Sequence, residues 1–206
     1  MNLKRKRNIG RLWGLSKSGE TKIIGITGAA RAVGTTSFAF ALAEYLRAIG
    51  QYKVALVEMN SHQDFRKICA TLKKAKMEED HSFSNGRITF YAEMSKFGIS
   101  KVFNEDYDYI IIDYGHKFHN IESFLRCSYK IVCASTYPWK LPEYQQLLTH
   151  IEEIKGSDKW LHVISGDEKI YKNIQRKYNI ATVRMPYIQD IEKIDGISVE
   201  FFQKII

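Results

Sequence analysis

Long apolar runs are absent from this sequence of 206 residues, which also contains only three prolines and three cysteines. A membrane-spanning helix needs roughly 18 successive apolar residues, and no stretch approaches that length. The basic start at residues 4–7 lacks the apolar core that would follow it in a signal peptide. The sequence therefore predicts a cytoplasmic protein, and peripheral attachment to a membrane surface is compatible with it.

The low cysteine count argues against a fold held together by disulfides or zinc. Cys69, Cys127 and Cys133 form an odd number, and their spacing provides no second pair for a structural zinc site. Hydrophobic residues make up 45% of the chain, which argues against a disordered or low-complexity chain. We therefore expect a single packed domain over residues 22–206, preceded by a basic arm at residues 1–21 that we expect to be flexible.

Positive charge is concentrated at the start of the chain. Residues 1–22 contain seven of the 31 lysines and arginines and one acid, Glu20, so they carry most of the net charge of +8. Such a segment attracts an anionic membrane or the phosphates of a nucleic acid, although a charge run is also typical of a solvated tail. Ile9, Leu12 and Trp13 follow a helical spacing that is compatible with a short helix at a membrane interface.

Short β-branched runs alternate with longer segments of helical period from residue 22 onward, which is typical of βαβ units. Strands are predicted at residues 23–27, 54–59, 88–92, 109–113, 131–135, 161–165 and 181–185. Helices are predicted at residues 36–49, 142–154 and 168–178, whereas residues 73–86 are predicted to form an exposed connection. The expected fold class is α/β: a single doubly wound, mostly parallel sheet of about seven strands with helices on both faces.

Residues 22–37 read KIIGITGAARAVGTTS and combine a strand, a loop of small residues and the start of a helix. Phosphate-binding loops are built in this way, because successive backbone N–H groups and a helix amino end converge on an anion. Small residues also occur in such turns for packing reasons. The loop alone therefore indicates a phosphate site only in combination with other landmarks.

Three further landmarks accompany the loop. Glu58 ends the second predicted strand, residues 109–113 form an apolar strand that ends in an acid, and Met185-Pro186 follows the last strand. With these features the chain resembles the ParA/MinD superfamily of deviant Walker A ATPases, whose loop runs Gly-Lys-Gly-Gly-Val-Gly-Lys-Thr-Thr where this chain has residues 29–37. The resemblance implies a P-loop NTPase fold of the SIMIBI type, ATP or ADP with Mg²⁺ as cofactor, and a homodimer.

The resemblance also implies roles for individual residues. Thr36 matches the threonine that ligates Mg²⁺, and Asp113 matches the Walker B acid that holds the metal through its water shell. Glu58 takes the position of the acid that positions the attacking water, so Glu58 and Asp113 are the candidate catalytic residues. The candidate nucleotide-binding residues are Ala30, Arg31, Ala32, Val33, Gly34, Thr35, Thr36, Ser37 and Pro186.

Both lysines of the family's loop are missing. The lysine that reaches across the dimer falls on Ala30, and the lysine that grips the β- and γ-phosphates falls on Thr35. Because phosphoryl transfer depends on positioned cations, their loss is expected to abolish nearly all hydrolysis. The chain is therefore interpreted as a degenerate nucleotide-binding protein, a non-hydrolysing or very slow scaffold that positions a partner assembly. Its Val-Gly-Thr-Thr run resembles the TadZ/CpaE pilus-assembly branch.

Two alternatives to this interpretation remain open. The first is an interaction protein that has lost nucleotide binding and uses the old site as a folded platform. The second is an atypical ATPase that relies on Arg31 or on a cation from its partner, because a guanidinium binds phosphate well. Titration with ATP and ADP in the presence of Mg²⁺ separates these alternatives.

Other candidate residues carry weaker signals. His116 and His119 have a spacing that suits a metal ion, although ordinary loop histidines explain it too. Tyr137 and Trp139 follow a predicted strand and are interpreted either as partner anchors or as a cap on the core. Residues 197–206 form an amphipathic tail, which we expect to dock on the domain core rather than bind a membrane, because it has little net charge.

Overall fold

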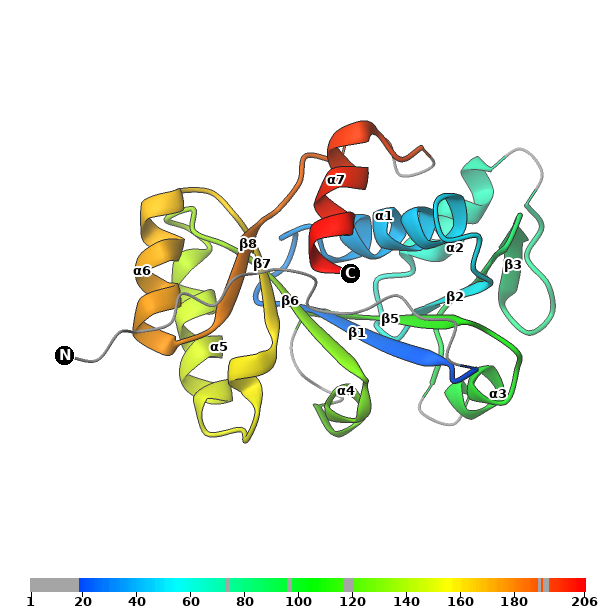
Figure 1. The fold of residues 1–206 in the computed structure, drawn as a ribbon. Helices are drawn as coiled ribbons and strands as arrows, with labels where there is room; N and C mark the ends of the chain where they lie inside the picture. The colour runs from blue at the N-terminus through cyan, green and yellow to red at the C-terminus, as the bar shows by residue number, and fades with distance from the viewer. Residues whose placement is uncertain (1–18, 73–74, 96–97, 117–120, 189, 191–192) are drawn as a thin grey trace.

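The structure, a computed structural model, describes residues 19–72, 75–95, 98–116, 121–188, 190 and 193–206 (Figure 1). These residues form one sheet of eight strands in the order β3-β4-β2-β5-β1-β6-β7-β8. The strands are β1 (Lys22–Gly28), β2 (Val54–Glu58), β3 (Ser82–Asn85), β4 (Ile88–Tyr91), β5 (Tyr109–His116), β6 (Tyr129–Ser135), β7 (Leu161–Ser165) and β8 (Ala181–Arg184).

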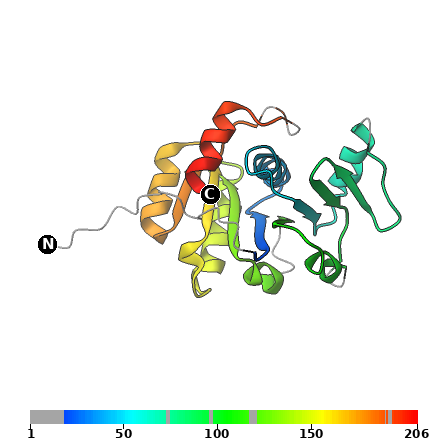
Figure 2. The same ribbon diagram turned by 45° about the vertical axis from the view of Figure 1, so that its right-hand side comes forward.

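Seven of the strands are parallel to their neighbours, and helices cover both faces of the sheet (Figures 1 and 2). The helices are α1 (Thr35–Ala48), α2 (Asp64–Thr71), α3 (Ile99–Phe103), α4 (Ile121–Arg126), α5 (Leu141–Glu152), α6 (Glu168–Tyr178) and α7 (Gly196–Ile205), with a 3₁₀ turn at Ser157–Lys159. The predicted α/β class and all seven predicted strands are therefore confirmed. The three predicted helices correspond to α1, α5 and α6.

The eighth strand, β3, corrects the prediction that residues 73–86 form only an exposed connection. It pairs antiparallel with β4, and its Phe83 is buried and stacks on Phe90 with ring centroids 4.6 Å apart. The sequence did not predict this strand, because only one of its four residues, Phe83, is buried, and the surrounding segment contains charges of both signs without a clear period. The signal that would have found it is Gly86, the first residue of the two-residue turn between β3 and β4, where it adopts a φ of 64°, since glycine is typical of that position in β-hairpins.

Alternate residues of the central strands face two separate cores. In β2, Val54 and Leu56 face the core under α1, α2 and α7, whereas Ala55 and Val57 face the core under α3 to α6. All four side chains are fully buried. Burial on both faces explains why these strands appear in the sequence as continuous apolar runs rather than as alternating ones.

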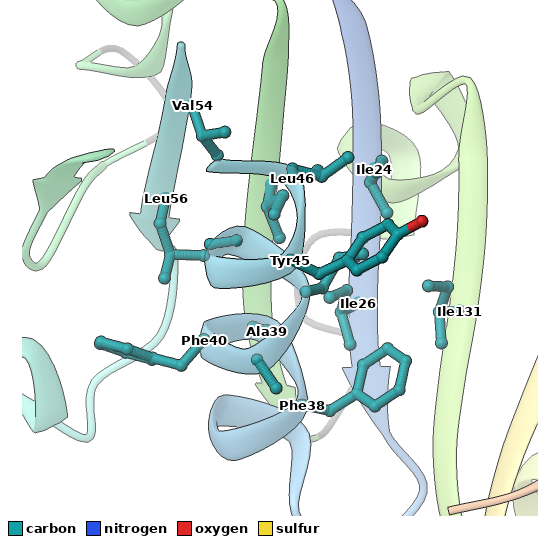
Figure 3. Packing of buried hydrophobic residues seen from close by; sticks show 14 of the residues in the cluster. Ile24, Ile26, Phe38, Ala39, Phe40, Tyr45, Leu46, Val54, Leu56 and Ile131 are labelled. Atoms are coloured by element: carbon teal, nitrogen blue, oxygen red, sulfur yellow. The ribbon is translucent and has the colours of Figure 1, made fainter. Parts of the chain in front are cut away.

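Helix α1 follows the β1–α1 loop and lies directly on the sheet. Figure 3 shows Phe38 and Tyr45 over β1, with Phe40 pointing toward the β2 side. These three side chains are at most 4% exposed, so the helix is fixed along its length by apolar packing. The β1–α1 loop is therefore held between two rigid elements.

The C-terminal helix α7 packs against α1, as expected for the amphipathic tail. Its Phe202 is fully buried, with ring centroids 5.5 Å from Phe38 and 5.3 Å from Tyr45. Ile197, at the start of the helix, is 70% exposed. Within the described ranges, no helix combines the length and the apolar character needed to cross a bilayer.

Candidate functional site

A cavity of about 410 Å³ opens at the carboxyl edge of the central strands. Open parallel α/β sheets bind ligands at this edge, beyond the ends of the strands. Strand β5 lies between β1 and β2 in the sheet, so the segments that follow these three strands meet there. The cavity is lined by Ala30, Arg31, Ala32, Gly34, Thr35, Thr36 and Ser37 after β1, by Ser61, His62, Asp64 and Lys67 after β2, and by Gly115 and His116 at the end of β5.

Most of the predicted nucleotide-binding residues therefore come together. Val33 and Pro186 are the exceptions, because both are buried and neither lines the cavity. Pro186 nevertheless follows Met185, which lies close to the loop: a Cβ atom built on Gly34 would be 3.6 Å from Met185 Cε. The end of β8 is thus a neighbour of the loop on the side away from α2.

The β1–α1 loop keeps a left-handed backbone at two positions, Ala32 with a φ of 58° and Gly34 with a φ of 90°. Gly34 is the N-cap of α1, and no side chain caps this helix end. The first turn also contains no acid, so its amino end retains donors and positive potential for an anion in the cavity. The loop thus keeps a left-handed conformation at residue 32, although an alanine stands there in place of a glycine of the ParA/MinD motif.

Thr36 and Asp113 form the pair on which the magnesium prediction depends. Thr36 Oγ1 donates a hydrogen bond of 2.7 Å to Asp113 Oδ2, and Asp113 Oδ1 accepts a bond of 2.8 Å from the Gly115 N–H. Burial raises the pKa of Asp113, while its bonds to Thr36 and Gly115 act in the opposite direction. Asp113 is fully buried and, unlike Thr36, does not line the cavity. A hydroxyl and a carboxylate therefore lie next to each other at the start of α1, and oxygen ligands of this kind suit Mg²⁺.

The two positions that would carry lysines contribute no charge. Ala30 and Thr35 line the cavity with short side chains that are 6% and 8% exposed. Thr35 Oγ1 packs against the loop base, because a Cβ atom built on Gly28 would lie only 2.5 Å from it. Arg31 also lines the cavity and is exposed, so it is the cation that the loop itself presents there.

Glu58 lies beneath the cavity and is not among its lining residues. Its carboxylate is fully buried, and Oε1 accepts a 2.7 Å hydrogen bond from the N–H of Asp64 at the start of α2. Burial raises its pKa to about 7, and the nearby charge of Asp113 acts in the same direction. Glu58 thus anchors α2 in this structure, and its predicted role toward an attacking water stays a prediction.

The segment that follows β2, residues 61–67, contains cavity-lining residues that were not predicted from the sequence. The rings of His62 and His116 stack with centroids 5.2 Å apart. Lys67 Nζ donates to Asp64 Oδ1 at 2.9 Å and to the His62 carbonyl at 3.0 Å. Their position just after a central strand, at the same edge as the loop, is the signal that could have found them.

The histidine and aromatic candidates have different outcomes. His116 ends β5, and His119 lies outside the described residues. Across the described ranges, no group of three or more His, Cys, Asp or Glu side chains is arranged to hold a metal ion.

Tyr137 and Trp139 are 49% and 69% exposed and stack on each other with centroids 5.3 Å apart, so the interpretation as a core cap is wrong. Their role as partner anchors stays a prediction.

Comparison with solved structures identifies the fold. No protein-family model and no curated protein matches the sequence. A ParA family ATPase from Chlorobium tepidum matches with a TM-score of 0.57 and 15% identity, over 90% of this chain and 91% of that chain. MinD in the MinC:MinD complex of Aquifex aeolicus matches with a TM-score of 0.61 and 12% identity, over 89% and 86%. Cobyrinic acid a,c-diamide synthase from Mycobacterium smegmatis with ADP and magnesium matches with a TM-score of 0.61 and 11% identity, over 90% and 92%. The protein therefore has the ParA/MinD-like P-loop fold.

Proposed function

We propose that this protein binds ATP or ADP with Mg²⁺ in the cavity at the β1–α1 loop and hydrolyses ATP very slowly or not at all. The observation that carries the proposal is the 2.7 Å hydrogen bond between Thr36 and Asp113 beside the uncapped amino end of α1. A helix amino end and successive loop N–H groups bind phosphate without any lysine. The cavity volume of about 410 Å³ also suits a small-molecule ligand.

The residues present fit a magnesium ion. Thr36 would hold it with its hydroxyl and the buried Asp113 would hold it through its water shell, and the charge of the ion would neutralise part of the phosphate charge. Asp113 is fixed on the rigid strand β5, in register with Ile26 of β1 and Glu58 of β2. The carboxylate of Asp113 is thus positioned by the sheet, and its hydrogen bond with Thr36 positions the hydroxyl on α1, before any nucleotide arrives, which lowers the cost of binding.

Slow hydrolysis follows from the side chains at the lysine positions. In phosphoryl transfer, most of the catalytic effect comes from cations that neutralise charge on the transferred group. Ala30 and Thr35 supply no such charge from the loop. An ATPase would have to rely on a cation outside these two positions, such as Arg31 or a cation from a partner.

The nucleotide would serve to position a partner assembly. One solved relative of the fold, MinD, is found in a complex with MinC. In this chain, the stacked and exposed pair Tyr137 and Trp139 is the candidate contact surface, because large aromatic side chains are common at the centres of interfaces. A homodimer is compatible with the proposal, but Ala30 has no charge with which to bridge to the phosphates of a second copy.

The test compares ligand-induced thermal stabilisation and ATP turnover in matched variants. Mg²⁺–ATP should raise the melting temperature of the wild type and of Thr149→Ala, an exposed threonine on α5, but not of Thr36→Ala. Turnover should stay below about one per minute, far under the usual range of enzymes. Faster turnover that Asp113→Asn abolishes would identify an atypical ATPase. Absence of any stabilisation by nucleotide would favour an interaction protein that has lost the ligand.

A further inference from the structure

The cavity is lined by a basic side chain from each of two segments. Arg31 comes from the β1–α1 loop, and Lys67 comes from the second turn of α2. Lys67 lies at neither of the two positions where the ParA/MinD motif has its lysines. The cavity thus has a lysine in α2, Lys67, whereas the loop has lost the two lysines of the motif at Ala30 and Thr35.

The ammonium group of Lys67 lies near the start of α2 and makes two hydrogen bonds there. Two of its three N–H donors are used, by Asp64 Oδ1 at 2.9 Å and by the His62 carbonyl at 3.0 Å. Asp64 is the first residue of α2, and His62 lies two residues before it. The N–H of Asp64 donates a hydrogen bond to the buried Glu58, which holds the amino end of α2 in place. The Lys67 side chain is 69% exposed, so its ion pair with Asp64 is weak and can be shared with an anion at little cost.

The order of the strands indicates which part of a bound nucleotide would lie near Lys67. A magnesium ion held near Asp113 would neutralise charge on the terminal phosphates of a nucleotide, and Asp113 is on β5. Beyond β5, on the side away from β1, lies β2, which leads into α2. Met185, at the end of β8, lies close to Gly34 on the opposite side of the loop. The terminal phosphate would thus be the group closest to α2.

We propose that Lys67 binds the terminal phosphate of a nucleoside triphosphate and makes the site select triphosphates over diphosphates. This inference rests on the proposed nucleotide binding and deepens it. Lys67 supplies, from within the same chain, a charge that Ala30 and Thr35 lack. The triphosphate is the ligand class because its terminal phosphate is the group that we place nearest to α2 from the order of the strands, and a diphosphate lacks that group.

The test measures the affinities for Mg²⁺–ATP and Mg²⁺–ADP by calorimetry in the full chain. Lys67→Gln should weaken ATP binding by about 10-fold to 100-fold, which corresponds to one hydrogen bond between charged groups. The same variant should leave ADP binding unchanged. Lys67→Arg should retain most of the preference for ATP because it keeps the charge.

Lys172→Gln is the matched control, because Lys172 forms an ion pair with Glu168 within α6 and does not line the cavity. It should change neither affinity. An equal loss of ATP and ADP binding in Lys67→Gln, or no loss at all, would overturn the inference while leaving the proposed function in place. If the wild type binds neither nucleotide, both the inference and the proposed function are wrong.

Discussion

Ala32 shows at the scale of one residue how the loop adopts a left-handed conformation at a position where the ParA/MinD motif has a glycine. An L-residue in the left-handed region costs roughly 1–2 kcal/mol, and Ala32 has a φ of 58° there. This cost is tolerated because the flanking elements β1 and α1 fix the loop ends. The loop conformation is thus imposed by the surrounding fold rather than by local preference.

Ala32→Gly should therefore stabilise the protein. We expect a gain of up to about 1 kcal/mol in the free energy of unfolding, because the relieved strain exceeds the extra entropy that glycine adds to the unfolded chain. Urea unfolding measures it. Ala70→Gly, at an exposed position inside α2, should instead destabilise by about 0.5–1 kcal/mol. Equal destabilisation by both variants would show that Ala32 is not strained.

Glu58 makes stability depend on pH near neutrality. Its folded pKa of about 7 lies above the ordinary value of 4.5, so the folded state holds a proton that the unfolded state has lost between these values. Stability should therefore fall as pH rises from about 4.5 to about 7, by roughly 1–3 kcal/mol from this group. Glu58→Gln should flatten that part of the profile measured by urea unfolding at several pH values. An unchanged profile in the variant would show that Glu58 ionises normally.

At the scale of elements, long apolar or amphipathic segments could be predicted from the sequence, and short ones could not. The buried strands β1, β2 and β5 and the long helix α1 have patterns that leave one interpretation. Helix α2 was missed because it has eight residues and buries only Phe65 and Cys69, too few to establish a period. The candidate site was predicted on the β1–α1 side, where a motif exists, and missed on the α2 side. On the α2 side no motif marks the lining residues. They reach the cavity because β2 lies next to β5 in the sheet, and this strand order cannot be read from the sequence.

Helix α7 owes its position to a small number of apolar contacts. Phe202 is fully buried against Phe38 and Tyr45, so Phe202→Ala should lower the free energy of unfolding by about 3–5 kcal/mol. Urea denaturation of the full chain measures this. Ile197→Ala, at a 70% exposed position of the same helix, should change stability by less than about 0.5 kcal/mol. Similar small effects for both would contradict the docked position of α7.

At the scale of the whole molecule, the net charge of +8 is concentrated in residues 1–22, most of which lie outside the described residues. We propose that this arm provides any attraction to acidic lipid or nucleic acid. Deletion of residues 1–20 should abolish binding to acidic vesicles or DNA at low salt, because salt-sensitive attraction depends on this charge. Co-sedimentation measures vesicle binding, and a preference for lipid over DNA would implicate Leu12 and Trp13. Equal binding by the truncated protein would show that the arm is a solvated tail.

The central claim is that a loop without lysines, together with Thr36 and Asp113, still forms a magnesium–nucleotide site. Calorimetric titration of the wild type with ATP, with and without Mg²⁺, tests it most directly. The account predicts one ATP per chain in the presence of Mg²⁺ and much weaker binding after the metal is chelated, a difference that Asp113→Asn should remove. No binding at millimolar ATP, or binding that is equally strong without Mg²⁺ and unaffected by Asp113→Asn, would contradict it.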